Sequence, residues 1–280
     1  MATATLAGVA IGDGQPIRVM AAINVSPESF YAGSIHADGP ALRDAVQRAV
    51  GEGADFIDIG AMSTAPYLQT HVPVEEEVRR MTWALRTVAA AVSVPLSADT
   101  TRATVAAAAI ANGARIINDV TGLRADPAMA DIAAMADGVV LAAAPVGAGA
   151  AAPLALIRQL WTESLERARA AGIPPEHIVL DPAIGFFVQA GVRPEVFNCI
   201  VLAGLCELAD LGRPLLVGVS RKSFIGKVTG GADTADRLWG SLAATAIAVY
   251  NGAALVRTHD VAATRDVVRV AAAIRRGGAD

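Results

Sequence analysis

Short apolar runs alternate with longer amphipathic stretches along almost the entire chain. Eight runs have the length of buried strands, and polar residues stand where they stop: Ile17–Asn24, Phe56–Gly60, Pro95–Thr100, Arg115–Val120, Val139–Ala144, Ile178–Pro182, Leu215–Lys222 and Leu255–Asp260. Stretches with helical composition cover residues 40–52, 75–91, 101–112, 126–136, 153–171, 194–210, 234–250 and 261–276. Eight strands that alternate with eight helices are the pattern of a (β/α)8 TIM barrel, so we expect one such domain over residues 1–280.

The connections predict where the chemistry of this barrel lies. Strand–helix–strand crossovers are right-handed, so the strands run parallel and their C-terminal ends gather at one face. Barrels of this kind carry their active sites at that face. Residues 5–14 precede the first strand, and we expect them to form a short hairpin that caps the bottom of the barrel.

Composition argues against membrane proteins and nucleic-acid-binding proteins. No uninterrupted apolar stretch reaches the ~20 residues that span a bilayer, and the N-terminus does not read as a secretory signal. The net charge of −4 offers no basic surface for nucleic acid. We therefore expect a cytoplasmic protein in which Cys199 and Cys206 are buried, inert thiols.

Polar side chains stand at the ends of most of the predicted strands: Asn24, Asp99, Asn118, Asp181, Lys222, Arg257 and His259. Any one Asp or Asn could instead cap a helix or start a turn, as Asp99 would before a helix that begins at Thr101. Together they favour a site, because an unpaired carboxylate in an apolar run is costly and caps need neither a lysine nor a histidine. The set predicts a ligand site at the mouth of the barrel.

The residue types indicate the class of ligand. Asp181 and Asn118 offer acceptors and a donor to the edge of a polar heterocycle such as a pterin or a purine. The last two strands, where barrel enzymes commonly hold phosphate, contribute Lys222, Arg257 and His259. We therefore expect a heterocycle that bears phosphate.

The segment Ser220–Ser223, followed by a helix or a turn, is a plausible oxyanion cradle. Its lysine leaves an alternative open, because Arg221 and Arg257 could lower the pKa of Lys222 and make it a Schiff-base nucleophile. The residues alone therefore also allow an aldolase or an isomerase.

Seven blocks of sequence resemble dihydropteroate synthase, of the pterin-binding barrel family. In order along nearly the whole chain they are INVSPESF (Ile23–Phe30), GADFIDIG with the following ST (Gly53–Thr64), SADT (Ser97–Thr100), INDVTG (Ile117–Gly122), DPAIGF (Asp181–Phe186), LVGVSRKSFIG (Leu216–Gly226) and RTHDV (Arg257–Val261). The resemblance implies an enzyme of folate biosynthesis that joins 6-hydroxymethyl-7,8-dihydropterin diphosphate to p-aminobenzoate with Mg2+ and releases diphosphate.

The resemblance also implies roles for individual residues. Asp99, Asn118, Asp181 and Lys222 would bind the pterin; Asn24, Arg257 and His259 would bind the diphosphate, with Asn24 also a ligand of the metal; Thr64, Pro66, Phe186, Ser220 and Arg221 would contact the acceptor. Lys222, Arg257 and His259 would carry the catalysis, which is mainly electrostatic stabilisation of the leaving diphosphate.

Four segments depart from the family pattern. Tyr31–Ser34 replaces an Asp and Gly pair, Met62–Pro66 replaces Glu-Ser-Thr-Arg-Pro, Ala142–Pro145 replaces a Met-His-Met-like stretch, and Phe187–Val188 replaces Gly-Lys. The first two segments resemble those of homologues from organisms that use tetrahydromethanopterin, whose acceptor is a larger arylamine bearing a ribofuranosyl phosphate. The small side chains of Ala142–Ala144 would leave room for that substituent.

These observations leave three hypotheses. The first is a synthase whose acceptor is p-aminobenzoate or its ribosylated relative. The second is a methyltransferase of the same superfamily that uses methyltetrahydrofolate, although such an enzyme needs no diphosphate site like Arg257 with His259. The third is a non-catalytic pterin-binding paralogue, which the missing loop Asp and Arg favour.

The resemblance further implies a homodimer formed through helices on one side of the barrel. The apolar faces of the stretches 194–210 and 234–250 are the candidates for this contact. Trp161 and Trp239 lie on predicted outer helices, and we expect them to be packing or interface residues.

Overall fold

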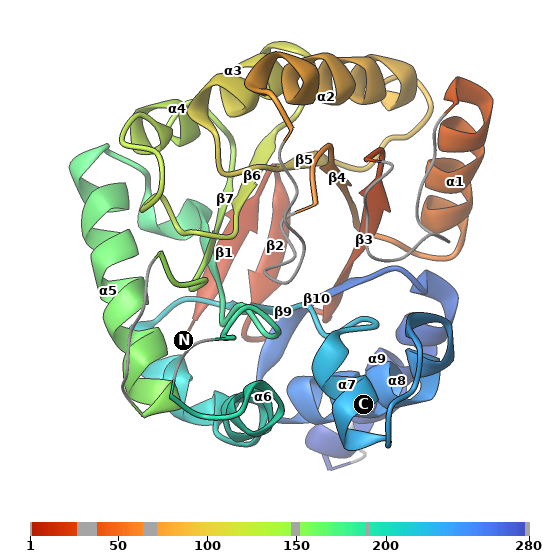
Figure 1. The fold of residues 1–280 in the computed structure, drawn as a ribbon, viewed down its shortest axis with the longest axis vertical. Coiled ribbons are helices and arrows are strands. Elements are labelled where there is room, and N and C mark those ends of the chain that lie inside the picture. Colours follow the sequence, from red (N-terminus) through yellow and green to blue (C-terminus); the bar gives the residue numbers. More distant parts are fainter. Residues whose placement is uncertain (1, 27–37, 64–71, 147–151, 189–190, 278–280) are drawn as a thin grey trace.

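The computed structural model describes residues 2–26, 38–63, 72–146, 152–188 and 191–277. Eight strands form a closed barrel: β3 (Arg18–Asn24), β4 (Phe56–Gly60), β5 (Leu96–Asp99), β6 (Ile116–Asp119), β7 (Val139–Ala142), β8 (Ile178–Asp181), β9 (Leu215–Val217) and β10 (Ala253–Thr258). Neighbouring strands are parallel, and β10 closes the barrel by pairing with both β9 and β3 (Figure 1). The predicted (β/α)8 barrel is confirmed.

Helices surround the barrel and connect its strands (Figure 1). They are α1 (Gly39–Gly51), α2 (Val74–Val88), α3 (Ala103–Ala111), α4 (Met129–Ala133), α5 (Pro153–Ala170), α6 (Pro194–Ala203), α7 (Ser223–Val228), α8 (Leu238–Tyr250) and α9 (Val261–Arg275), with 3-10 helices η2 (Pro175–His177), η3 (Leu205–Leu211) and η4 (Thr234–Arg237). The predicted helix 194–210 divides at Gly204, where α5 approaches so closely that a Cβ would lie 2.7 Å from Leu154 Cδ1.

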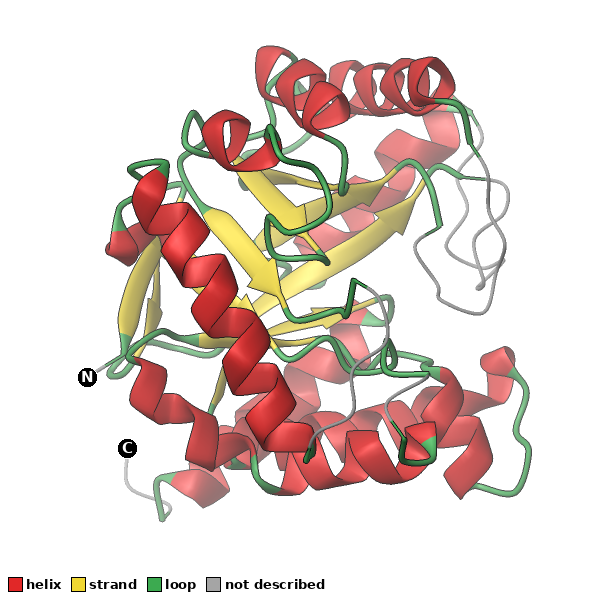
Figure 2. Ribbon diagram, turned by 60° about the vertical axis from the view of Figure 1, so that its left-hand side comes forward, coloured by secondary structure: helices red, strands yellow, loops and turns green. Residues whose placement is uncertain are grey.

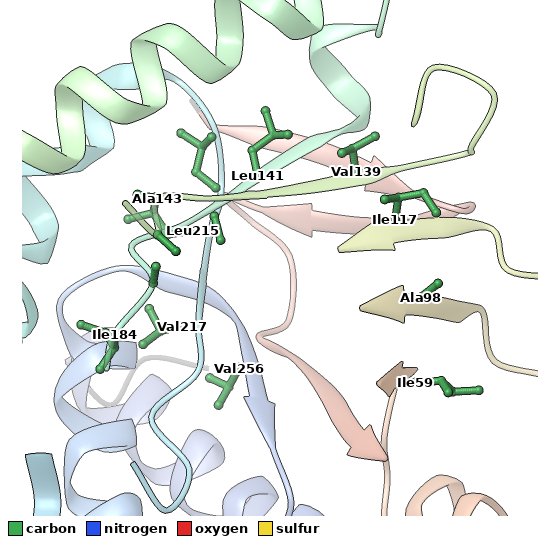
Figure 3. Packing of buried hydrophobic residues seen from close by; sticks show 14 of the residues in the cluster. Ile59, Ala98, Ile117, Val139, Leu141, Ala143, Ile184, Leu215, Val217 and Val256 are labelled. Atoms are coloured by element: carbon green, nitrogen blue, oxygen red, sulfur yellow. The ribbon is translucent and has the colours of Figure 1, made fainter. Parts of the chain in front are cut away.

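Side chains on the barrel strands alternate between two apolar environments, because successive residues of a strand point to opposite faces. One set points outward and packs against the helices; Figure 3 shows Ile59, Ala98, Ile117 and Leu141 among them. The other set forms a separate cluster within the barrel: Met20, Phe56, Ile116, Val140, Val179, Leu216 and Leu255.

An antiparallel hairpin closes the lower end of the barrel. Its strands are β1 (Thr3–Leu6) and β2 (Val9–Gly12), and the fully buried Leu6 and Ile11 belong to the same cluster as the interior residues. Figure 2 shows the hairpin at one end of the barrel, with the arrowheads of the barrel strands directed to the other. The predicted cap at the bottom is therefore present. Among the described residues, no helix is long and apolar enough to cross a membrane.

Candidate active site

A layer of polar side chains, which we call the polar layer, lies inside the barrel between the apolar cluster and the C-terminal ends of the strands. Residues two positions apart on a strand point to the same face. Phe56 is followed in this way by Asp58, Ile116 by Asn118, Val179 by Asp181 and Leu255 by Arg257. Four strands thus place charged or amide side chains inside the barrel at the end where the sequence predicted the site.

Arg257 joins two carboxylates within this polar layer. Its Nε donates to Asp58 Oδ2 at 2.6 Å, and its Nη2 donates to Asp99 Oδ2 at 2.8 Å. Asn118 Nδ2 donates to the same Asp58 oxygen at 3.0 Å. Asp58 is not among the predicted site residues, yet it connects Asn118, predicted to bind the pterin, with Arg257, predicted to bind the diphosphate. The alternation from Phe56 to Asp58 was the signal that could have identified it.

Burial and charge act in opposite directions on the pKa values of this network. Burial raises the pKa of Asp99 to about 7, although Arg257 opposes the shift. Burial lowers the pKa of Arg257, but the charges of Asp58 and Asp99 outweigh it, so the pKa lies above its ordinary value. The guanidinium is therefore a permanent cation that helps to keep Asp99 ionised.

Three acceptor oxygens of the network lack a partner among the described residues. They are Asp58 Oδ1, Asp99 Oδ1 and Asn118 Oδ1, and all three atoms are buried. Buried acceptors without partners are rare, because each loses its hydrogen bonds to water. The arrangement suits a ligand that brings several N–H donors into the barrel.

Lys222 follows β9 and contributes a second cation near the polar layer. Burial, and then the charge of Arg257, lower the pKa of Lys222 to about 8 against the opposing charges of Asp181 and Asp99. Its Nζ lies 4.3 Å from the ring centroid of Phe186, within the range of a cation–π interaction. The structure thus places Phe186 against Lys222. A contact between Phe186 and the acceptor remains a prediction.

The segment after β8 combines a tight turn with a close approach to the lysine. Asp181 Oδ1 accepts from Ala183 N at 2.8 Å, so Asp181 also starts a turn, and burial raises its pKa to about 6. Gly185 has φ +90°, and a Cβ there would lie 2.9 Å from Lys222 Cδ, so this position requires glycine. Asn198 of α6 holds the turn by accepting from Gly185 N at 2.8 Å.

Ser220 orients His259. The hydroxyl Oγ lies 3.0 Å from His259 Nδ1 and also accepts the backbone N–H of His259 at 3.2 Å. Burial, together with the charges of Arg257 and Lys222, lowers the pKa of His259 to about 3. The imidazole is therefore neutral at pH 7 and offers hydrogen bonds rather than charge. The contact of Ser220 with an acceptor stays a prediction.

The guanidinium of Arg221 points to partners within the protein. It makes two hydrogen bonds with Asp260, at 2.9 and 2.8 Å, and donates to the carbonyls of Thr234 and Ala235. Arg221 is buried and has φ +55°, a conformation that these bonds stabilise. The structure therefore gives Arg221 a structural role, and its predicted contact with the acceptor is untested.

Asn24 ends β3 beside Gly60 of β4. A Cβ on Gly60 would lie 3.1 Å from Asn24 Oδ1 and 3.9 Å from Asp99 Oδ2, so both oxygens border this glycine. No group of three or more His, Cys, Asp or Glu side chains in the described part of the chain could hold a metal ion. A small number of oxygen ligands such as Asn24 Oδ1 suits Mg2+, which is commonly held by one or two protein ligands and by phosphate oxygens.

The predicted acceptor residues Thr64 and Pro66 lie outside the described residues, as does Tyr31–Ser34. Ala142–Ala144 is described, and its three side chains are buried at 4% exposure or less. These alanines therefore provide no open space for a larger acceptor. Phe187 is also buried, and it stacks on Phe197 of α6 with 4.2 Å between the ring centroids.

The helix-cap alternative for Asp99 is excluded, and the expectation that the two cysteines are buried is wrong. Asp99 does not cap a helix: α3 begins at Ala103, whose backbone N–H donates to Asp126 Oδ2 at 2.8 Å. Cys199 and Cys206 are exposed rather than buried. Trp161, in contrast, is fully buried as a packing residue, and its Nε1 donates to the carbonyls of Leu141 and Asp181.

Several known proteins are similar to this chain over most of its length. A family model described as pterin binding enzyme matches residues 20–259. Dihydropteroate synthase of Synechocystis sp. is 35% identical over 271 residues, which cover 94% of this chain and 92% of the relative. A protein of Mycobacterium tuberculosis named inactive dihydropteroate synthase 2 is 37% identical over 272 residues, which cover 92% of this chain and 82% of the relative.

Solved structures of Xanthomonas albilineans dihydropteroate synthase have the same fold. The structure with 4-aminobenzoic acid has a TM-score of 0.85 and 38% identity, and the structure with 7,8-dihydropteroate has a TM-score of 0.83 and 36% identity. Each comparison covers 98% of this chain and 99% of the other.

Proposed function

This chain belongs to the pterin-binding enzyme family, and we propose that it is a transferase that joins 6-hydroxymethyl-7,8-dihydropterin diphosphate to an arylamine and releases diphosphate. The observation that carries the proposal is the polar layer, in which Asp58, Asp99 and Asn118 present buried acceptor oxygens beside the cations Lys222 and Arg257. A pterin edge supplies the N–H donors that these oxygens lack.

The reaction breaks the C–O bond between the pterin methylene group and the diphosphate, which leaves with the electron pair. The arylamine nitrogen then bonds to the methylene carbon and loses a proton to solvent. Little acid–base chemistry is required, so stabilisation of the leaving anion dominates. Arg257 contributes a fixed positive charge and the neutral His259 a hydrogen bond, while Lys222, with its pKa near 8, is protonated at neutral pH and binds the heterocycle.

Mg2+ is the metal that we propose for this reaction. Asn24 Oδ1 is the protein oxygen that would hold it, with phosphate oxygens of the substrate completing the coordination. The ion would neutralise charge on the departing diphosphate. Removing Mg2+ with a chelator should therefore abolish turnover while binding of the pterin without its diphosphate persists.

We propose p-aminobenzoate as the acceptor, because the Xanthomonas albilineans synthase was solved with this compound and with 7,8-dihydropteroate. The ribosylated arylamine stays a weaker alternative that rests on the loop sequences alone. Incubation with the pterin diphosphate, Mg2+ and each arylamine in turn separates the two by the rate of diphosphate release.

A second candidate is a pterin-binding protein without synthase activity, because the Mycobacterium tuberculosis relative is named inactive. Tight binding of the pterin diphosphate without turnover on either arylamine would favour this candidate. Lys222→Ala and Asp181→Asn should each weaken pterin binding by tenfold or more, to order of magnitude. Normal binding by both variants would refute the site assignment for either candidate.

We also propose that the protein is a homodimer through α8 and the helices next to it. An apolar groove of about 700 Å³ between α8 and α9 is lined by Trp239, Ile247, Tyr250, Val270 and Ile274, among others. Trp239 is 79% exposed there, and a second groove between α6, α7 and α8 shares Ile247 with the first. Exposed apolar patches of this kind mark interfaces.

Sedimentation tests the dimer. Ile247→Glu places a charge in both grooves and should yield monomers that retain the fold. Met135→Glu is the matched control, because Met135 is 67% exposed but lines neither groove. A monomeric parent protein at micromolar concentration would refute the proposal.

A further inference from the structure

A buried carboxylate outside the polar layer binds the segment that follows Asp99. Glu77 lies on α2 and is fully buried. Thr100 Oγ1 donates to Glu77 Oε1 at 2.8 Å, and Arg102 Nη1 donates to Glu77 Oε2 at 2.8 Å. A carboxylate is buried only at considerable desolvation cost unless both oxygens are bonded, as they are here.

Thr100 is fixed through its backbone as well as through its side chain. Its backbone N–H donates to Asn118 O at 3.1 Å, and its hydroxyl accepts from Arg102 N at 3.2 Å. Asp99, one residue earlier, bonds Arg257 at 2.8 Å. The hydroxyl of Thr100 therefore connects Glu77 to the backbone that joins two residues of the polar layer.

The start of α3 does not require Glu77. The first backbone N–H of that helix is bonded by Asp126, at Ala103 N, and Arg102 also has the carbonyl of Val72 as a partner, at 2.8 Å. A carboxylate at position 77 is thus not explained by helix capping. What it adds is a counter-charge for Arg102 and a strong acceptor for the hydroxyl of Thr100.

We propose that Glu77 is a positioning residue for the pterin diphosphate: through Thr100 it sets where Asp99 and Asn118 present their oxygens to the heterocycle. This inference rests on the proposed function, because that function makes Asp99 and Asn118 contacts of the substrate. Glu77 itself touches no substrate.

The test uses the full-length protein and three variants. Glu77→Gln keeps one acceptor for Thr100 but turns an N–H donor toward Arg102, and Thr100→Val removes the hydroxyl. Each should raise KM for the pterin diphosphate about tenfold and leave KM for the arylamine within about twofold. Thr100→Ser retains the hydroxyl and should restore the parent value.

A purely structural role would lower the active fraction, and so kcat, without moving KM. Asp55→Asn is the control for such a role, because Asp55 is a part-buried carboxylate at the start of β4 that accepts from Val19 N and pairs with Arg18 and Arg265. Asp55→Asn should destabilise the protein and leave both KM values unchanged. If Glu77→Gln behaves in the same way, the proposal is wrong.

A crystal structure of ligand-free Glu77→Gln separates this inference from the proposed function. A displaced Asp99 carboxylate, no longer bonded to Arg257, supports the positioning role whether or not the parent protein turns over. An Asp99 carboxylate still 2.8 Å from Arg257 Nη2, as in the parent structure, overturns it. Failure of the parent protein to bind the pterin diphosphate would instead refute the proposed function.

Discussion

At the scale of single residues, one guanidinium organises the polar layer. Arg257 is bonded to Asp58 and Asp99, and Asp58 is in turn bonded to Asn118. A buried ion pair of this kind contributes little net stability, because desolvation offsets the attraction. Removing Asp58 is different, because Arg257 would keep only Asp99 as a partner among the residues that the structure describes and Asn118 Nδ2 would lose its charged acceptor.

Asp58→Asn should therefore lower the free energy of unfolding by about 2 kcal/mol, since Arg257, whose side chain is only 19% exposed, loses the shorter of its two ion pairs. Urea unfolding measures the change. Asp137→Asn is the control, because Asp137 and its ion-pair partner Arg115 are both more than half exposed. This variant should change the free energy of unfolding by less than about 1 kcal/mol. Equal losses in the two variants would contradict a special role for Asp58.

The pH dependence of donor binding follows from three groups of the site. Asp181 and Asp99 accept hydrogen bonds most strongly when they are ionised, and burial raises the pKa of Asp181 to about 6 and that of Asp99 to about 7. Lys222 must be protonated to donate, and its pKa is lowered to about 8 by burial and by Arg257. Affinity for the pterin diphosphate should therefore rise as the pH increases through about 6 to 7 and fall as it passes about 8.

Calorimetric titrations across this pH range measure the profile. In Asp181→Asn the rise on the acidic side should shift toward pH 7, because the amide does not titrate and Asp99 still does, whereas the loss of affinity above about pH 8 remains. A parent protein whose affinity is flat from about pH 5 to about pH 9 would contradict the roles given to these groups.

At the scale of elements, short segments after the strands place the cations. The turn after β8 brings the backbone of Gly185 against Lys222 and is held by Asn198 of α6. The strand pattern and most helix ranges were predictable, because they depend on the spacing of apolar residues along the chain. The division of the helix predicted over 194–210 was not predicted; it falls at Gly204, which lies close to Leu154 of α5.

Gly185→Ala should weaken binding of the pterin diphosphate and destabilise the fold by about 1 kcal/mol, because φ is positive there and the new Cβ meets Lys222. Gly172→Ala is the matched control, since φ is +77° but nothing lies within 4 Å of its Cβ. It should lose similar stability and keep its affinity, as binding and denaturation experiments would measure. Unchanged affinity in Gly185→Ala would contradict the close approach.

At the scale of the whole molecule, the interior is divided into an apolar lower part and a polar upper part. The hairpin β1–β2 completes the lower part with Leu6 and Ile11, while the strand ends supply the upper part. Stability and chemistry are thus placed at opposite ends of one barrel, as is usual for this fold.

Leu6→Ala tests this division. The change opens a cavity beneath the barrel and should lower the free energy of unfolding by about 3 kcal/mol, because Leu6 is fully buried. Affinity of the folded protein for the pterin diphosphate should be unaffected. Chemical denaturation and titration calorimetry give the two quantities, and a parallel loss of affinity would show that the two ends are coupled.

The sequence by itself determined the order of the strands and helices, the hairpin, the family, and most of the polar residues at the mouth of the barrel. These features depend on near neighbours in the chain, through apolar periodicity and through blocks such as SRKSFIG. Only the tertiary structure decided which of these residues bond one another. Arg257 meets Asp58 across 199 positions of sequence and Asp99 across 158, because closure of the barrel brings β10 beside β3.

The pairing of β10 with β9 brings Arg221 to Asp260, and closure of the barrel places Asp58 between Asn118 and Arg257. The role of Glu77 could not be predicted from local sequence, because Glu77 lies on α2 and its partners Thr100 and Arg102 lie on the loop between β5 and α3. Local sequence patterns predict which side chains lie at the end of a strand. Their charges acquire partners only when the barrel closes and excludes water from them.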